Sequence, residues 1–147
     1  MEKKEQYRLL ERQLSALLEG ETDTVAKMAN MAAVLHETFG FWWTGFYRVA
    51  GADLILGPFQ GPVACMHIPF GKGVCGTAWA RNGTVVVPDV EQFPGHIACS
   101  SASRSEIVVP VHDRNGAVVA VLDIDSDRLG TFDDVDKEAL ERLVKLL

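Results

Sequence analysis

The sequence predicts an α+β fold in which an antiparallel sheet of about six strands carries helices on one side. Apolar residues recur at helical spacing near both ends of the chain, and short β-branched or aromatic runs separated by turn residues fill its middle. The chain has 147 residues, of which 48% are hydrophobic and 23% charged, which is ordinary for one globular domain. We therefore expect residues 1–147 to form a single domain.

Two helices are expected to open the domain. In the first, which ends near Gly20, apolar residues fall at steps of three and four, with Leu9 and Leu18 alongside: Tyr7, Leu10, Leu14 and Leu17. The second begins after a cap at Thr22, Asp23 or Thr24 and has its own apolar face: Val25, Met28, Ala29, Ala32 and Leu35. The apolar face of the first helix packs either in the core, which we favour, or on a partner chain.

The middle of the chain reads as strands with one short helix, Val74–Arg81, inserted among them. Asn115 and Gly116 form a dipeptide that favours a tight hairpin between the last two strands. Thr131-Phe-Asp-Asp134 resembles a capping box, and it is expected to start a terminal helix. The expected strands are Trp42–Val49, Asp53–Phe59, Val63–Pro69, Thr84–Pro88, Ser105–His112 and Ala117–Asp125.

Composition excludes several classes of function. The net charge of −6 argues against a nucleic-acid groove, because phosphate binding needs clustered Lys and Arg. Apolar runs fall short of bilayer length, and residues 1–11 are charged throughout rather than resembling an export signal. We therefore expect a cytoplasmic protein that does not enter the membrane.

The chain has three cysteines, Cys65, Cys75 and Cys99, and an odd count without an export signal argues against a framework of structural disulfides. Zinc sites usually contain close Cys pairs or closely spaced His pairs, and neither spacing is present. We therefore expect no metal, with a site assembled from residues far apart in the chain as the alternative. On composition alone, buried inert thiols are the ordinary interpretation.

Several fragments together resemble one enzyme family, the GAF-domain free methionine-R-sulfoxide reductases. The likeness runs from Trp43-Thr-Gly-Phe-Tyr47 to the terminal helix, and it brings all three cysteines and three acidic residues into register. The fragments are Gly61-Pro-Val-Ala-Cys65, Ile68-Pro-Phe-Gly-Lys-Gly-Val-Cys75-Gly-Thr-Ala78, Gly95-His-Ile-Ala-Cys99, Ser103-Arg-Ser-Glu106-Ile-Val-Val-Pro110 and Val121-Leu-Asp-Ile-Asp-Ser126.

The resemblance implies reduction of free L-methionine-R-sulfoxide to methionine without a bound cofactor. It assigns the attacking thiolate to Cys99, which would become a sulfenic acid, and the resolving thiol to Cys65. The resulting Cys65–Cys99 disulfide would be reduced by thioredoxin as the external partner. Cys75 stands at the expected start of a helix, where amide groups can stabilise a thiolate. It serves either as a second resolving thiol or as a small buried residue.

Three carboxyl groups complete the expected site. Asp123 and Asp125 share one face of a strand, because side chains alternate along it, and convergence with Glu106 would raise the pKa of at least one acid. The resemblance assigns Glu106 and Asp125 to protonation of the sulfoxide oxygen and Asp123 to orienting the substrate. It makes Trp43 the wall for the substrate methyl group and Tyr47 a neighbouring contact.

Two other classes of function are weighed against the enzyme. A GAF sensory module would hold a small ligand without chemistry, and a thiol redox sensor would oxidise without turning over a substrate. The sequence also leaves a homodimer open. Outside the expected site, His96 is read as shaping its loop, and Ser103 and Arg104 as surface residues.

Overall fold

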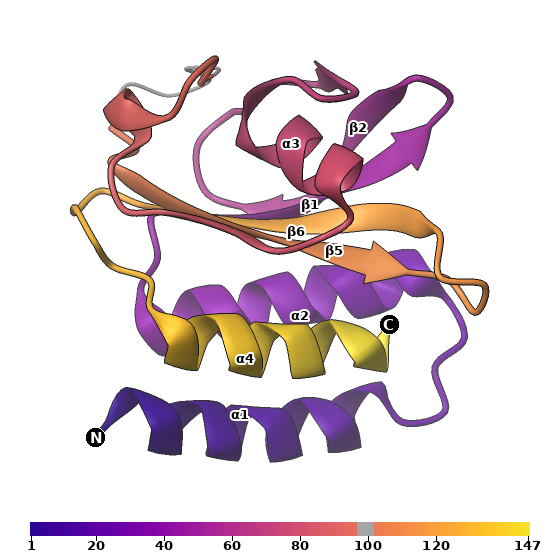
Figure 1. Cartoon of the computed structure of the whole chain (residues 1–147). Coiled ribbons are helices and arrows are strands. Elements are labelled where there is room, and N and C mark those ends of the chain that lie inside the picture. The colour runs from indigo at the N-terminus through magenta and orange to yellow at the C-terminus, as the bar shows by residue number, and fades with distance from the viewer. Residues whose placement is uncertain (97–101) are drawn as a thin grey trace.

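The computed structural model describes residues 1–96 and 102–147, and a six-stranded antiparallel sheet lies at its centre (Figure 1). The strand order is β3-β2-β1-β6-β5-β4. The strands are β1 (Trp43–Ala50), β2 (Asp53–Gln60), β3 (His67–Pro69), β4 (Val85–Val87), β5 (Ser105–His112) and β6 (Val118–Ser126). The helices are α1 (Lys3–Leu18), α2 (Thr24–Phe39), α3 (Gly73–Arg81) and α4 (Asp134–Leu143), with short 3-10 turns η1 (Val90–Gln92) and η2 (Val144–Leu146).

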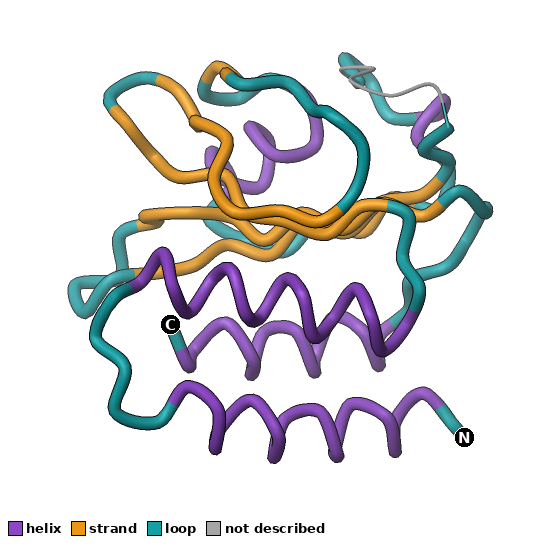
Figure 2. The backbone as a smooth tube through the Cα atoms, turned by 180° about the vertical axis from the view of Figure 1, so that it is seen from behind, coloured by secondary structure: helices purple, strands orange, loops and turns teal. Residues whose placement is uncertain are grey.

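Helices α2 and α4 cover one face of the sheet, and α1 lies outside them as a further layer (Figures 1 and 2). The N- and C-terminal helices therefore gather on one side of the sheet, as predicted, while α3 lies on the opposite side. The α+β fold class is confirmed. Within the described residues, no helix is long and apolar enough to span a bilayer.

The apolar face of α1 packs in the core against α2 and α4, which confirms the favoured interpretation. The predicted inner residues were wrong at three helix positions. Leu18 is 6% exposed and Leu17 48% exposed, because the next turn of the stripe falls four residues after Leu14. In α2, Val25 is 54% exposed, and Met31 lies in the core where Ala29 was expected.

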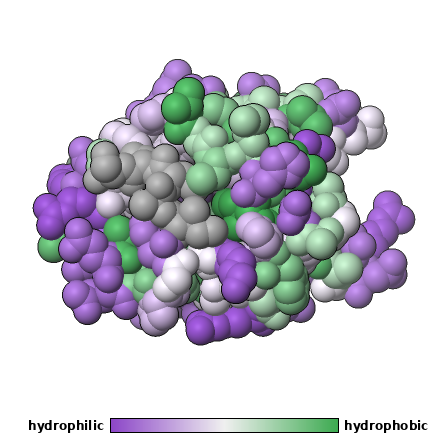
Figure 3. All heavy atoms as spheres, turned by 90° about the horizontal axis from the view of Figure 1, so that it is seen from above, coloured by the Kyte–Doolittle hydropathy of each residue, from purple (hydrophilic) through white to green (hydrophobic). Residues whose placement is uncertain are grey.

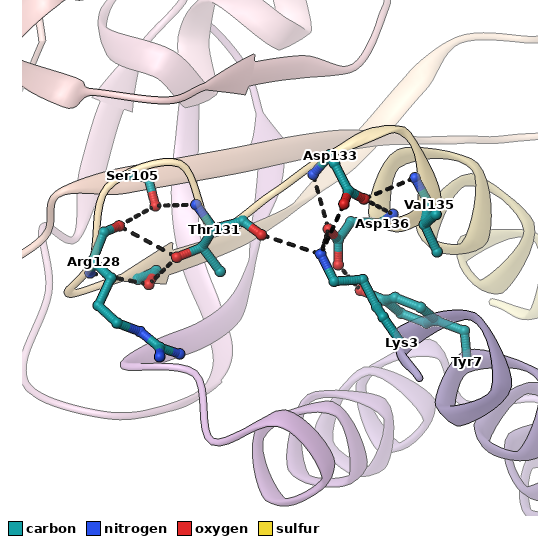
Figure 4. A network of polar contacts seen from close by, with 9 residues as sticks. Lys3, Tyr7, Ser105, Arg128, Thr131, Asp133, Val135 and Asp136 are labelled. Atoms are coloured by element: carbon teal, nitrogen blue, oxygen red, sulfur yellow. Dashed lines mark hydrogen bonds and ion pairs between the residues drawn. The ribbon is translucent and has the colours of Figure 1, made fainter. Parts of the chain in front are cut away.

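A buried polar network joins α1 to the start of α4 (Figure 4). The Tyr7 hydroxyl donates to Asp136 Oδ1 at 2.6 Å, and Lys3 Nζ donates to Asp136 Oδ2 at 2.7 Å. Asp136 is 1% exposed, and it forms the capping box of α4 with Asp133, two residues beyond the predicted start at Thr131. The same carboxylate thus caps one helix and anchors another.

Two further predictions concern the strands. Residues 63–66 form a loop, so the expected strand Val63–Pro69 shrinks to the three residues of β3; Val63 is 88% exposed and lacks a buried face to pack. The hairpin at Asn115-Gly116 is confirmed, since Asp113 and Ala117 close the turn between β5 and β6. Side chains on the face of the sheet toward α3 line a second core, and the candidate site lies there.

Candidate active site

The register of the central strands brings the three predicted acids together. Glu106 on β5 is the direct partner of Asp125 on β6, and Asp123 lies two residues earlier on the same face of β6. On the other side of β6, Asp125 pairs with Trp43 and Asp123 pairs with Gly45. Alternation along strands therefore converts a sequence pattern into a cluster of carboxyl groups facing α3.

Burial and mutual repulsion favour the protonated forms of these acids. Burial raises the pKa of Glu106 well above its ordinary value, and the charges of Asp123 and Asp125 raise it further. Burial, followed by the charge of Asp123, likewise raises the pKa of Asp125, and burial raises that of Asp123. Among the described residues, Asp123 Oδ1 is buried and has no hydrogen-bond partner. The cluster can supply both a proton donor and an ionised carboxylate.

Cys75 contributes a thiol to the same cluster. Cys75 Sγ and one carboxyl oxygen each from Glu106 and Asp123 lie within 4.8 Å of one another. Burial, with the charges of the acids, raises the pKa of Cys75 well above its ordinary value. Its place at the start of α3 is as predicted, but stabilisation of a thiolate there is not, because desolvation by the surrounding core outweighs the helix amides.

Thiols and carboxyls are metal ligands in general, so Cys75, Glu106 and Asp123 are the described residues that could hold an ion. Ligation requires the thiolate and carboxylate forms. Burial raises the pKa of each of the three groups and favours the protonated forms. A bound cation would oppose that shift, because its charge favours the ionised forms.

Stacked aromatic side chains form another wall of the site. Trp43 stacks between Tyr47 and Phe59, with ring centroids 5.9 and 5.2 Å away. Gly45 makes this possible, because a Cβ there would lie 2.7 Å from the Trp43 ring and 2.3 Å from Phe59 Cβ. The absence of a side chain at Gly45 therefore leaves room for the indole ring and for Phe59.

Two polar side chains, His96 and Ser103, lie near the acids and belong to the segments on either side of residues 97–101. Ser103 Oγ donates to Asp125 Oδ1 at 3.4 Å, and His96 Nε2 lies 3.9 Å from Glu106 Oε1. Burial lowers the pKa of His96, which favours the neutral ring. Sequence reasoning placed Ser103 at the surface and gave His96 a role in loop shape. The positions of Ser103 and His96 in the sequence did not predict these contacts. Arg104 is exposed, as expected.

These groups line a pocket with about 530 Å³ of empty space, part of it open to solvent. Figure 3 looks onto this side of the molecule and shows apolar residues near its centre with polar ones around them. None of the described residues lining the pocket is Lys or Arg. An apolar wall faces several acids, so the pocket fits a small ligand with a cationic group and an apolar end.

The predicted site residues are placed as follows. The pocket brings together Trp43, Tyr47, Cys75, Glu106, Asp123 and Asp125. Cys65 is half-buried in the loop that follows β2, next to the pocket-lining residues Val63 and Ala64. Cys99, predicted to be the nucleophile, falls within 97–101 and lies outside the described residues.

Comparison with known proteins adds independent information. The GAF domain family matches residues 19–147. The chain is 49% identical to the free methionine-R-sulfoxide reductase of Escherichia coli, covering 100% of this chain and 89% of that protein. It is 45% identical to the enzyme of the same name from Saccharomyces cerevisiae, covering 89% of this chain and 77% of that protein. Among solved structures, the free methionine-R-sulfoxide reductase of Neisseria meningitidis with its substrate superposes with a TM-score of 0.97 at 53% identity, covering 99% of this chain and 88% of that chain.

Proposed function

Because this chain belongs to the family of GAF-domain free methionine-R-sulfoxide reductases, we propose that it reduces free L-methionine-R-sulfoxide to methionine. The observation that carries the proposal is the pocket itself, which is lined both by stacked aromatic rings and by three acids, of which Glu106 and Asp123 are buried. A sulfoxide has an apolar methyl group and a polar oxygen on the same sulfur. A pocket with one apolar and one proton-donating side can bind the methyl group and the oxygen at separate positions, and so select one epimer.

Glu106 and Asp125 act on the oxygen in this proposal. Burial raises the pKa of both carboxyl groups and favours their protonated forms, and the carboxyl proton can pass to the sulfoxide oxygen as its bond to sulfur breaks. The donating acid must lie within hydrogen-bond reach of that oxygen. The methyl group lies against Trp43, which the stack with Tyr47 and Phe59 holds in place.

Asp123 binds the α-ammonium group. Within the part of the chain that the structure describes, its Oδ1 atom is buried and has no hydrogen-bond partner, and the pocket lining includes no Lys or Arg that would compete for it. A cationic ligand also favours the ionised form of one acid. The amide of a peptide-bound sulfoxide carries no such charge, so we propose that the enzyme prefers the free amino acid.

Cys99 supplies the electrons. Its thiolate attacks the sulfoxide sulfur, methionine leaves, and the oxygen ends on the cysteine sulfur as a sulfenic acid, which is two electrons more oxidised than the thiol. Cys65 then displaces that oxygen as water and forms the Cys65–Cys99 disulfide. A thioredoxin dithiol reduces it and is itself oxidised. The raised pKa of Cys75 favours its packing role over that of a second resolving thiol.

The test is turnover in the presence of thioredoxin, thioredoxin reductase and NADPH, which would also support the cytoplasm as the working compartment. We expect NADPH oxidation with the free R-sulfoxide and little with the free S-sulfoxide or with a peptide that contains the R-sulfoxide. In a single turnover, Cys99→Ser should release no methionine, whereas Cys65→Ser should release about one equivalent, the stoichiometry of one sulfenic acid per active thiol. Ligand binding without NADPH oxidation would instead support a sensory module.

A further inference from the structure

The loop Gly61–Met66 connects β2 to β3 and carries Cys65. It lacks helix or strand structure, and four of its six residues are exposed. Its far end is held by β2, since Leu56 N donates to Met66 O at 3.0 Å. A loop with so little buried surface needs other contacts to keep one conformation.

Two aromatic side chains of β1 supply such contacts, and both bind the loop's backbone. Trp43 Nε1 donates to Pro62 O at 3.0 Å, and the Tyr47 hydroxyl donates to Cys65 O at 2.9 Å. The second bond ends on the carbonyl of the cysteine itself. The two bonds thus hold the loop at points three residues apart, with Cys65 at one of them.

Both donors are themselves rigid. Trp43 and Tyr47 are 3% and 2% exposed, and their rings stack on each other. Burial, and then the charge of Asp123, raises the pKa of Tyr47, so its hydroxyl keeps the proton that it donates. Gly61 adapts the loop to the indole, because a Cβ there would lie 2.8 Å from Trp43 Cδ1.

We propose that Tyr47, assisted by Trp43, is a positioning residue that holds the Cys65 loop so that the Cys65 thiol meets the sulfenic acid. This inference rests on the proposed function, and it gives the two aromatics a role in the second chemical step. In that step the Cys65 thiol attacks the sulfenic sulfur, the S–O bond breaks, and water leaves with the thiol proton. A misplaced loop slows this attack without removing either sulfur.

The test compares two identical substitutions on opposite faces of the sheet. Tyr47→Phe keeps the ring and removes the donor to Cys65 O, whereas Tyr7→Phe removes a buried hydroxyl that bonds Asp136. We expect Tyr47→Phe to slow disulfide formation by about five- to tenfold more than it slows methionine release, as the loss of one hydrogen bond allows. Tyr7→Phe should leave the ratio of the two rates at the wild-type value.

Two readouts separate positioning from a general structural effect. Dimedone labelling in a single turnover should show more trapped sulfenic acid in Tyr47→Phe than in wild type. Hydrogen exchange of the amides in 61–66 should be faster in Tyr47→Phe and unchanged in Tyr7→Phe, and this measurement needs no substrate. Equal disulfide rates and equal exchange in Tyr47→Phe and wild type would overturn the inference. Failure of the wild-type protein to release methionine would overturn the proposed function instead.

Discussion

Glu106 and Asp125 are direct partners across β5 and β6, with their carboxyl groups on the same buried face of the sheet. Opposed residues in an antiparallel pair have Cβ atoms about 5 Å apart, and like charges at that distance repel strongly once water is excluded. The pair therefore resists losing both protons. Burial and this repulsion both raise the pKa of the pair and favour a shared proton.

Replacing Glu106 by Gln should remove proton donation while keeping the size of the side chain. We expect methionine formation to slow by about 10²–10⁴-fold, the usual contribution of general-acid assistance, while Cys99 still reacts with iodoacetamide. Quenched-flow measurement of methionine in a single turnover tests this. The exposed carboxylate Glu91 offers a control, since Glu91→Gln should leave the rate unchanged. A wild-type rate in Glu106→Gln would place the proton elsewhere.

The same carboxyl should make the fold more stable in acid than at neutral pH. Its pKa is raised in the folded state, so above the ordinary Glu value of 4.5 the native protein holds a proton that the unfolded chain has lost. The free energy of unfolding contributed by Glu106 therefore falls as pH rises through that window. Glu106→Gln cannot ionise, so its melting temperature relative to wild type should increase from pH 4.5 to pH 8, as measured by calorimetry. A constant difference would contradict a raised pKa.

Gly45→Ala should disturb the aromatic wall. The added Cβ would lie 2.7 Å from the Trp43 ring and 2.3 Å from Phe59 Cβ, so both side chains must move. We expect a loss of about 1–3 kcal/mol in the free energy of unfolding, typical of overpacking, together with a raised KM. Urea denaturation and steady-state kinetics measure the two effects. Gly83→Ala is the matched control, since its nearest neighbour would be 3.9 Å away; similar losses in both variants would count against steric displacement of Trp43.

Asp136→Asn should loosen α1 from the rest of the domain. The Asp136 carboxylate accepts bonds from Tyr7, Lys3 and the Asp133 amide, and Asn presents an NH₂ group to some of these donors. Leaving buried donors unpaired should cost about 2–4 kcal/mol in the free energy of unfolding. Chemical denaturation tests this. Glu11→Gln, which breaks an exposed pair with Arg142, should change stability by less than about 1 kcal/mol. Equal stabilities of the two variants would refute the role of Asp136.

The sequence predicts the acid cluster because alternation in a strand is a strong rule, and Asp123 and Asp125 follow it. It does not predict what side chains do with the backbone of a loop. The strand expected at Val63–Pro69 was right for the three residues of β3 and wrong over 63–66. The β-branched Val63 signals a strand, whereas Trp43 and Tyr47 bind backbone carbonyls of this segment as a loop. Such contacts depend on residues some eighteen positions apart in the chain.

The apolar faces of the helices also show that local spacing predicts an element but not every buried residue in it. Spacing located α1 and α2 but misassigned Leu17 and Val25, because steps of three and steps of four are both consistent with one turn. The contacts of Ser103 and His96 with the acids arise where separate segments converge on one pocket, which spacing along the chain does not encode.

Because β6 lies between β1 and β5, the pocket cannot assemble during synthesis until β6 has been made. The β1–β2 hairpin can form from local contacts, but Trp43 meets Asp125 only after more than eighty further residues have been made and β6 has entered the sheet. All three cysteines precede β6 in the chain. A nascent chain therefore carries its thiols before the pocket exists, and the final strand brings in Asp123 and Asp125, which line that pocket together with Cys75.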